Sequence, residues 1–219
     1  MASERKNAGQ AKPDGALSRR RRIRRARRVQ RIATVVTVVA LGLGLLGLGL
    51  WLLFERQPEV TVLLYPMEYE TLIRARAAEN GVDPALVAAV ILAESSYQPE
   101  AVSSVNAQGL MQLLPSTAEW VAGKFDEEYA EGSLFDPEVN VKYGCWYLGY
   151  LLRRFDGDVT CAAAAYHAGQ GTVDEWLSNP EYSPDGATLA RIPSEATDTY
   201  VGRVVRYYEK YSELYAAQA

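Results

Sequence analysis

The sequence has few of the side chains that bind metals or form covalent intermediates. Its 219 residues include one histidine, His167, and two cysteines, Cys145 and Cys161. One histidine cannot supply the usual zinc ligands, and no Cys–His arrangement of a thiol nucleophile is visible. The composition therefore argues against a metallopeptidase or a thiol amidase.

Sustained alternation of apolar and polar residues is also absent, and so are internal repeats. Without that alternation there is no basis for expecting a sheet. Helix signals recur instead, because Asp-Pro and Pro-Ser pairs open apolar segments and glycines close them. The sequence predicts an all-α fold, with helices at Met67–Asn80, Asp83–Ser95, Pro115–Trp120, Asp136–Phe155, Asp158–Gly169 and Asp198–Ala217.

Charge is distributed unevenly along the chain. Residues 1–31 hold twelve Lys and Arg against two Asp and Glu, a net charge of +10. The remaining residues hold eleven basic against twenty-five acidic side chains, a net charge of −14. Because a nucleic acid attracts positive charge, the acidic remainder argues against nucleic-acid binding.

An uncharged hydrophobic run of 22 residues, Ala33–Phe54, separates the two regions. A helix of about 20 residues crosses the bilayer core, whereas a cleaved signal peptide has a shorter core and a small-residue cleavage site. We expect a single transmembrane helix at residues 32–54. The nine arginines between Arg19 and Arg31 place the N-terminus in the cytoplasm by the positive-inside rule.

This topology predicts a single-pass protein of the cell membrane with its main domain outside the cell. Residues 1–31 form a basic, disordered cytoplasmic tail, residues 55–64 a tether, and residues 65–219 one domain of ordinary size. An exported cysteine pair can oxidise. However, Cys145 and Cys161 lie on consecutive helices at offset heights, and a bridge needs Cα atoms within about 7 Å. We expect buried free thiols, with a disulfide as the alternative.

Glu94 is the first candidate for chemistry, because it ends an almost wholly apolar helix. Partial burial disfavours a carboxylate and raises its pKa, which suits a general acid near neutral pH. A glutamate that faces water at a helix end is the alternative, and Glu94 alone leaves both open.

The segment after Glu94 adds further candidates. The Gln112 amide can orient a sugar hydroxyl or an N-acetyl group. Met111 can form an adaptable apolar wall, or it can belong to the core. Tyr166 lies at a helix end beside a glycine turn, where a half-buried core residue is the common alternative.

Several separated motifs occur together and in one order. They are Glu94-Ser95, Ala101-Val102-Ser103, Gly109-Leu110-Met111-Gln112, Pro115-Ser116-Thr117-Ala118, Ala164-Ala165-Tyr166-His167-Ala168-Gly169, and Ile192-Pro193 with Tyr200-Val201. This set resembles the soluble lytic transglycosylase family of peptidoglycan-cleaving enzymes, and it covers nearly all of residues 65–210. The overall resemblance is greatest to membrane-anchored members from Gram-positive bacteria.

The resemblance implies that residues 65–219 form a lysozyme-like helical catalytic domain. It implies one catalytic carboxylate, that of Glu94, with Tyr200 pointing toward it. The substrate-binding residues that it implies are Ser103, Met111, Gln112, Tyr166 and Tyr200.

The implied reaction cleaves the β-1,4 bond between N-acetylmuramic acid and N-acetylglucosamine without water. Glu94 protonates the glycosidic oxygen and then, as a carboxylate, deprotonates the muramic C6 hydroxyl, which leaves a 1,6-anhydro end. Because one residue serves as acid and then as base, this reaction requires no metal and no cofactor. The partners are glycan strands of peptidoglycan and the cytoplasmic membrane; any partner in the cell-wall machinery stays unidentified.

Two alternatives stay open. A hydrolytic muramidase of the lysozyme type needs a second carboxylate, for which Glu100 is the nearby candidate. A non-catalytic peptidoglycan-binding scaffold is the other. Three departures from the family pattern bear on it: His167 replaces an asparagine, Ala196 a glutamate and Asp198 an arginine.

Overall fold

The computed structural model describes residues 30, 33–34, 36–51 and 63–215. The chain divides into two units, residues 1–61 and 62–219. Residues 36–51 are helical, and no helix in the described part of the chain is both long and apolar enough to cross a membrane. Residues 32, 35 and 52–54 of the predicted transmembrane segment lie outside the described residues, as do nearly all of the basic tail and most of the tether.

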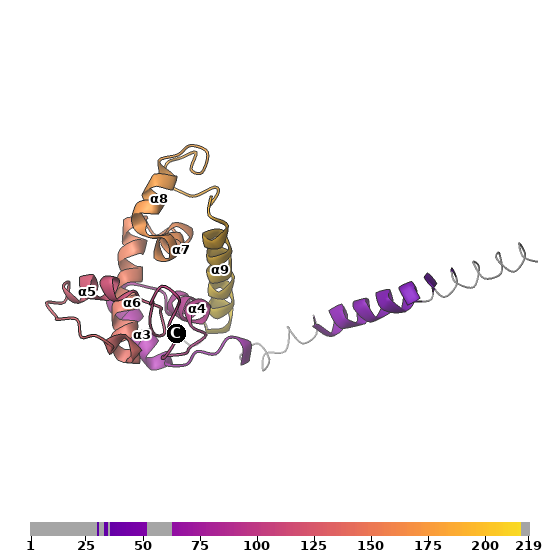
Figure 1. Cartoon of the computed structure of the whole chain (residues 1–219), viewed down its shortest axis with the longest axis horizontal. Coiled ribbons are helices and arrows are strands. Elements are labelled where there is room, and N and C mark those ends of the chain that lie inside the picture. Colours follow the sequence, from indigo (N-terminus) through magenta and orange to yellow (C-terminus); the bar gives the residue numbers. More distant parts are fainter. Residues whose placement is uncertain (1–29, 31–32, 35, 52–62, 216–219) are drawn as a thin grey trace, which may run out of the picture. The chain divides into compact units, whose positions relative to one another are not determined.

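The second unit confirms the predicted all-α class (Figure 1). Its described residues contain no strand, only isolated bridges that join Gln108 to Val102 and to Leu113. The elements are α3 (Glu70–Asn80), α4 (Pro84–Glu94), α5 (Pro115–Ala122), the 3-10 turn η1 (Ser133–Phe135), α6 (Pro137–Arg154), α7 (Val159–Ala168), α8 (Gln170–Leu177) and α9 (Glu195–Tyr215).

Three aspartates begin helices as the sequence predicts. The side chain of Asp83 accepts a hydrogen bond from a backbone N–H of α4 at 2.9 Å, and Asp136 does the same for α6 at 2.9 Å. Asp158 caps α7 at 2.6 Å. Each carboxylate satisfies an N–H that lacks a partner inside its helix, which stabilises a helix by about 1 kcal/mol.

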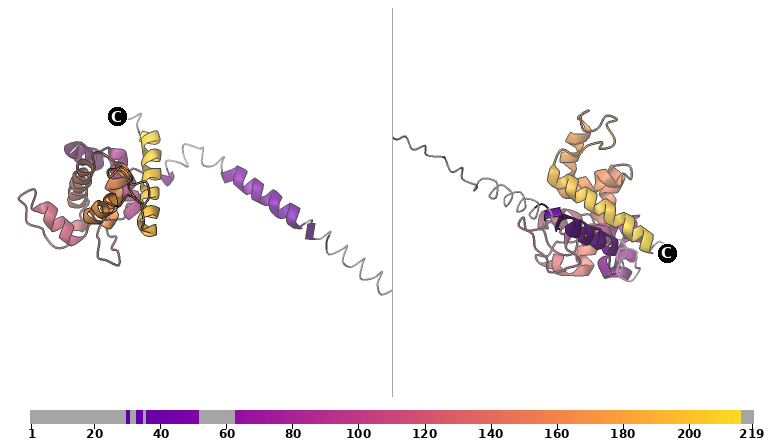
Figure 2. Two further views of the ribbon diagram at one scale, coloured as in Figure 1. Left: turned by 90° about the horizontal axis from the view of Figure 1, so that it is seen from above. Right: turned by 90° about the vertical axis from the view of Figure 1, so that its right-hand side faces the viewer.

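The apolar helix α4 lies at the centre of the core. Seven of its eleven residues are buried, and it packs against α3 and α9. Figure 2 shows α9, in yellow, running along one side of the unit. Burial of a valine, leucine or isoleucine stabilises a fold by about 1.5–3 kcal/mol, so α4 is held firmly in place. Its last residue, Glu94, is therefore set in a fixed position at the edge of this core.

The structure confirms that Gly169 ends the helix that begins after Asp158, but it also contains a helix that the sequence analysis did not predict. This helix, α8, starts directly at Gln170. Gly169 has φ 89° and turns the chain sharply, so that one glycine both ends α7 and precedes α8. The buried Val173 and the half-buried Trp176 and Leu177 follow a helical spacing that could have indicated α8.

Three helix boundaries differ from the prediction by more than one residue. Helix α5 ends at Ala122 rather than Trp120. Helix α3 begins at Glu70 rather than Met67, because Tyr69 adopts a left-handed conformation with φ 58°. Helix α9 begins at Glu195 rather than Asp198, and residues 216–219 lie outside the described part of the chain.

Both cysteines are free and buried, as predicted. Burial raises the pKa of each thiol to about 12, so neither is a reactive thiolate near neutral pH. The Cys161 thiol lies 3.9 Å from the backbone carbonyl of Ala187.

Candidate active site

Glu94 ends α4 with its carboxyl group largely surrounded by protein. The hydroxyl of Tyr200, on α9, donates a hydrogen bond to Glu94 Oε1 at 2.7 Å. Burial raises the pKa of Glu94 to about 7, while the hydrogen bond from Tyr200 and the positive charge of Arg203 oppose this rise. The carboxyl group can therefore exchange its proton near neutral pH, as a general acid or base must.

Tyr200 is only 3% exposed, and its hydroxyl group is held as a donor to Glu94. Burial and the charge of Glu94 raise the pKa of Tyr200 well above its ordinary value, so it stays neutral. Arg203, one turn further along α9, lies with its guanidinium carbon 5.8 Å from the centre of the Tyr200 ring. The two α9 residues thus supply a neutral donor and a positive charge beside one carboxyl group.

No carboxylate of the described residues makes a hydrogen bond with Glu94 or contributes to the rise of its pKa. Glu100, the nearby acid in the sequence, is exposed. The arrangement around Glu94 is therefore that of a single acid with a tyrosine partner.

His167 lies on the solvent side of this pair. Its ring stacks on the ring of Tyr200, with centroids 4.7 Å apart and an angle of 30° between the planes. The side-chain nitrogen Nδ1 lies 3.2 Å from the hydroxyl oxygen of Thr197. Burial of part of the ring and the charge of Arg203 lower the pKa of His167. The other two departures, Ala196 and Asp198, are exposed in the first turn of α9.

A loop at residues 101–114 lies beside Glu94 and is held by Asn140, which the sequence did not indicate. Asn140 is fully buried on α6. Its side-chain oxygen accepts from the Met111 N–H at 2.8 Å, and its nitrogen donates to the carbonyls of Gln108 at 2.9 Å and Leu134 at 2.8 Å. A lone asparagine in an amphipathic helix gives no sequence signal of such a role.

Gly109 allows Asn140 to reach the loop. The glycine has φ 75°, and a Cβ atom on it would lie 2.1 Å from the Leu134 carbonyl oxygen and 2.2 Å from Asn140 Nδ2. No other residue fits there without moving the loop. The glycine of the Gly-Leu-Met-Gln motif is thus required by a close backbone approach.

Gln112 and Ser103 use their polar groups on the loop itself. The Gln112 amide nitrogen donates to the carbonyls of Ala101 and Gly109, both at 3.0 Å. The Ser103 hydroxyl accepts from the Ala107 N–H at 3.0 Å. The donors of Gln112 that were expected to orient a sugar are therefore occupied, and its amide oxygen is the atom left for a ligand.

Met111 and Tyr166 fix the loop to the core. The Met111 side chain is fully buried, and a Cβ atom on Gly144 would lie 2.2 Å from its sulfur. The Tyr166 hydroxyl donates a hydrogen bond to the Met111 carbonyl at 2.8 Å. Burial and the charge of Glu94 raise the pKa of Tyr166. Of the two interpretations of Met111, its side chain has the position of a core residue.

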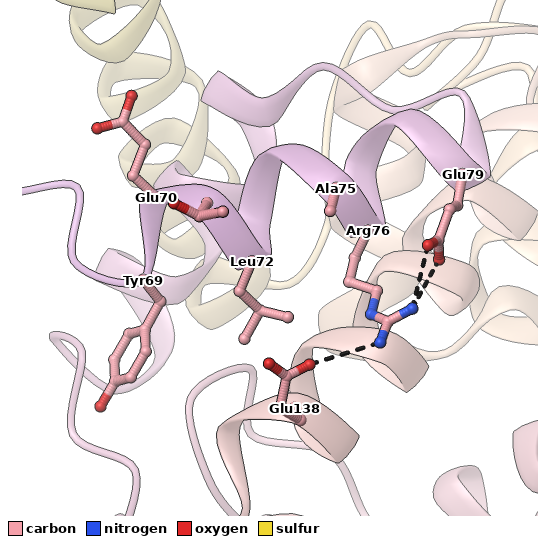
Figure 3. A pocket seen from close by; sticks show the side chains of 8 residues that line it. Tyr69, Glu70, Leu72, Ala75, Arg76, Glu79 and Glu138 are labelled. Carbon is pink, nitrogen blue, oxygen red and sulfur yellow. Dashed lines mark hydrogen bonds and ion pairs between the residues drawn. The ribbon is translucent and has the colours of Figure 1, made fainter.

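The structure therefore brings Glu94, Tyr166 and Tyr200 together from α4, α7 and α9. The Ser95 hydroxyl donates to the Leu110 carbonyl at 2.8 Å, which ties the loop with Gln112 to the end of α4. A separate hollow of about 530 Å³ on α3 shares no residue with this group (Figure 3). There Arg76 pairs with Glu79 and Glu138.

Comparison with known proteins identifies the family of this chain. A family model described as the Transglycosylase SLT domain matches residues 71–187. The soluble lytic murein transglycosylase of Escherichia coli K12 is 34% identical over 146 residues, which are 65% of this chain and 23% of that protein. The membrane-bound lytic murein transglycosylase C of Actinobacillus pleuropneumoniae is 32% identical over 170 residues, 67% of this chain and 46% of that protein.

Solved structures show the same fold. The 70 kDa soluble lytic transglycosylase from Escherichia coli superposes with a TM-score of 0.62 at 30% identity, covering 68% of this chain and 25% of that one. An inactive mutant of the lytic transglycosylase Slt from Pseudomonas aeruginosa gives 0.61 at 31% identity, covering 68% and 24%. The chain thus spans about a quarter of these soluble relatives. All these relatives come from Gram-negative bacteria, so the membrane-anchored Gram-positive type stays a prediction.

Proposed function

The chain belongs to the Transglycosylase SLT domain family, and from this premise we propose that it is a lytic transglycosylase of peptidoglycan. The proposed reaction cleaves the β-1,4 bond between N-acetylmuramic acid and N-acetylglucosamine and leaves a 1,6-anhydromuramic acid end. One observation carries the proposal. Glu94 is a single buried carboxyl group with a pKa of about 7 that is held by Tyr200.

In the first step Glu94 acts as the acid. At neutral pH a large fraction of its carboxyl groups is protonated, because burial raises the pKa to about 7. It donates the proton to the glycosidic oxygen as the bond from that oxygen to C1 of the muramic acid breaks. The N-acetyl group of the substrate stabilises the positive charge at C1, so no second carboxylate is needed.

In the second step Glu94, now a carboxylate, acts as the base. It accepts the proton of the C6 hydroxyl while that oxygen attacks C1 of the same sugar, and the acid is restored. The hydrogen bond from Tyr200 stabilises the carboxylate between the two steps. A pKa near the working pH serves both roles, because neither the acid nor the base form is strongly disfavoured.

We further propose that residues 32–54 anchor the chain in the cell membrane, with the N-terminus in the cytoplasm and the catalytic domain outside. The uncharged run Ala33–Phe54 and the arginines before it support this topology. A membrane-bound relative is consistent with it. The glycan strands of the cell wall would then be the substrate that the domain meets.

The test is an analysis of products. The full chain in detergent micelles is incubated with purified peptidoglycan, and the released fragments are identified by mass spectrometry. We expect fragments one water lighter than hydrolytic products, and a loss of rate of about 10³-fold or more in Glu94→Gln. Glu100→Gln, which removes an exposed acid near the site, is the matched control and should retain activity.

Two results would change the proposal. Ordinary reducing-end fragments that still depend on Glu94 would identify a hydrolytic muramidase. Binding to peptidoglycan with no fragments at any pH would identify a non-catalytic scaffold.

A further inference from the structure

Four aromatic side chains form a cluster between α5 and α6, apart from the residues that contact Glu94. Trp120 belongs to α5, and Trp146, Tyr147 and Tyr150 belong to α6. The three rings of α6 are nearly parallel, at 3° for Trp146 with Tyr150 and 13° for Tyr147 with Tyr150. Trp120 lies across all three, with centroids 5.2–6.1 Å away and angles of 72–86°. We name these four residues the aromatic platform.

The exposure of Trp120 is not explained by the packing of α5. That helix is already anchored by Ala118, Val121 and Ala122, which are fully buried. The Trp120 side chain is instead 38% exposed. The exposed part of this indole ring is an amphipathic surface on which the apolar face of a ligand can pack.

Exposed apolar side chains of the domain gather in one part of its sequence. Among the described residues 65–215, the large apolar side chains classed as exposed are Val102, Val105, Leu114 and Trp120. The first three belong to the loop beside Glu94, and Leu114 directly precedes α5. The exposed apolar side chains of these residues therefore come from the loop beside Glu94 and from the helix that follows it.

A row of ring contacts also joins the platform to the acid. The Tyr147 ring lies 6.1 Å from Trp120 on one side and 5.4 Å from Tyr166 on the other. Tyr166 in turn donates a hydrogen bond to the Met111 carbonyl at 2.8 Å, and the neighbouring Leu110 carbonyl accepts one from Ser95, the residue after Glu94, at 2.8 Å. Continuity with this site favours a ligand that occupies both places at once, as a polymer does.

Charge argues against a lipid surface at the platform. Lys124 lies over Trp120, with its amine 5.2 Å from the ring centre. The loop that follows carries the exposed acids Asp126, Glu127, Glu128 and Glu131. Anionic lipid headgroups would be repelled by these carboxylates. A neutral sugar ring fits better, because its C–H face packs on an aromatic ring and its oxygens can accept from a lysine.

We propose that the aromatic platform, through Trp120, binds a sugar ring of the glycan strand outside the residues that surround Glu94. The inference rests on the proposed function for the identity of the strand. It makes Trp120 a binding residue for long strands, and it makes Lys124 a donor to the oxygens of the bound sugar.

The first test measures binding without cleavage. The full chain carrying Glu94→Gln, in detergent micelles, is sedimented with purified peptidoglycan, alone and with Trp120→Ala added. We expect Trp120→Ala to weaken binding at least fivefold. Glu119→Ala, at the neighbouring exposed position of α5, is the matched control and should change binding less than twofold. Equal binding with and without the Trp120 ring would overturn the proposal, as would a loss shared by Glu119→Ala.

A second measurement covers the case in which Trp120→Ala does not fold. A tetrasaccharide of alternating N-acetylglucosamine and N-acetylmuramic acid is compared with polymeric strands in the chain with Glu94 intact. In Trp120→Phe, which keeps a ring, we expect the KM for the polymer to rise more than that for the tetrasaccharide. Equal rises would mean that Trp120 acts through the fold rather than on the strand, and would overturn the proposal.

The remaining outcomes separate the inference from the proposed function. Weakened binding to phosphatidylglycerol vesicles, with unchanged binding to peptidoglycan, would assign the platform to lipid. If the chain cleaves peptidoglycan but Trp120→Ala leaves binding to peptidoglycan unchanged, only this inference fails. If no cleavage occurs and Trp120→Ala still weakens binding, the proposed reaction fails and the platform stands.

Discussion

Asn140 and Glu94 are both polar side chains among apolar helices, but they are paired in different ways. Asn140 is fully buried, and it makes hydrogen bonds with Met111, Gln108 and Leu134. Glu94 accepts one side-chain hydrogen bond, from Tyr200, and burial raises its pKa to about 7. A fully paired buried group makes one arrangement rigid, whereas an incompletely paired acid stays able to exchange its proton. The hydrogen bonds of Asn140 fix the loop at residues 101–114, whereas the incomplete pairing of Glu94 suits it to acid–base chemistry.

The largest effect on stability is expected at Asn140. In Asn140→Leu the Met111 N–H and the Leu134 carbonyl lose the Asn140 side chain as a partner, whereas the Gln108 carbonyl still accepts from the Leu113 N–H at 3.1 Å. Each buried unpaired group costs about 1–3 kcal/mol, so the free energy of unfolding should fall by about 4 kcal/mol. Urea unfolding followed by circular dichroism measures it. The matched control is Asn179→Ala, which removes a local hydrogen bond to Glu181 and should cost about 1 kcal/mol or less.

Glu94→Gln is expected to increase the free energy of unfolding, by an amount that depends on pH. The pKa of Glu94 rises from its ordinary 4.5 to about 7 on folding, so the native state holds a proton that the unfolded state has released. Native stability is therefore lost as pH rises through this range, by about 3 kcal/mol in total. Glutamine does not ionise, so its stability relative to glutamate should increase between pH 5 and 8. A difference independent of pH would contradict the raised pKa.

Tyr200→Phe tests the pairing of the acid. The hydrogen bond from Tyr200 lowers the pKa of Glu94, so its loss should raise that pKa further. The rate of cleavage, which needs protonated Glu94 in its first step, should then decline at a higher pH in the variant than in the parent. Initial rates from pH 5 to 9 measure the pH at which the rate declines. The loss of the hydrogen bond should also lower the free energy of unfolding by about 1 kcal/mol. If the rate declines at the same pH in the variant and the parent, Tyr200 does not affect the pKa of Glu94.

The smallest effect is expected at His167. Its pKa is lowered from the ordinary 6.5 by burial of part of the ring and by Arg203. The folded state therefore resists protonation, and its stability is lost as pH falls from 6.5 through the folded pKa. In His167→Asn the loss of stability at low pH should be smaller, as measured by thermal unfolding. Because the chain has one histidine, its imidazole signals in an NMR titration report this pKa directly, and a value above 6.5 would contradict the prediction.

The sequence was most informative where structure depends on neighbouring residues. The caps at Asp83, Asp136 and Asp158 were predicted correctly, because each aspartate pairs with an N–H two or three residues away. The apolar helix that ends in Glu94 was also predicted from its own composition. The missed helix α8 shows the limit of such signals, because Gly169 was interpreted only as an end.

The candidate site was less accessible to sequence reasoning. Glu94 was indicated by its helix, but the approach of Tyr200 came only from the family resemblance. Gln112 was predicted to orient a sugar with its amide group. Its nitrogen donates to the carbonyls of Ala101 and Gly109, which the sequence did not indicate, and contact of its oxygen with a sugar stays a prediction. No pattern indicated Asn140, because two of its three partners, Gln108 and Met111, lie in a loop far from it in the sequence.

Local composition was therefore enough to specify most of the helices, the acidic domain and an acid at the end of an apolar helix. Helix propensity, capping and charge act over a few residues, so they can be seen in the sequence. The pKa of Glu94, the pairing with Tyr200 and the position of the loop were decided by packing of segments that are far apart in the chain. Burial and hydrogen bonding exist only once α4, α6, α7 and α9 have come together, and so does the chemistry that depends on them.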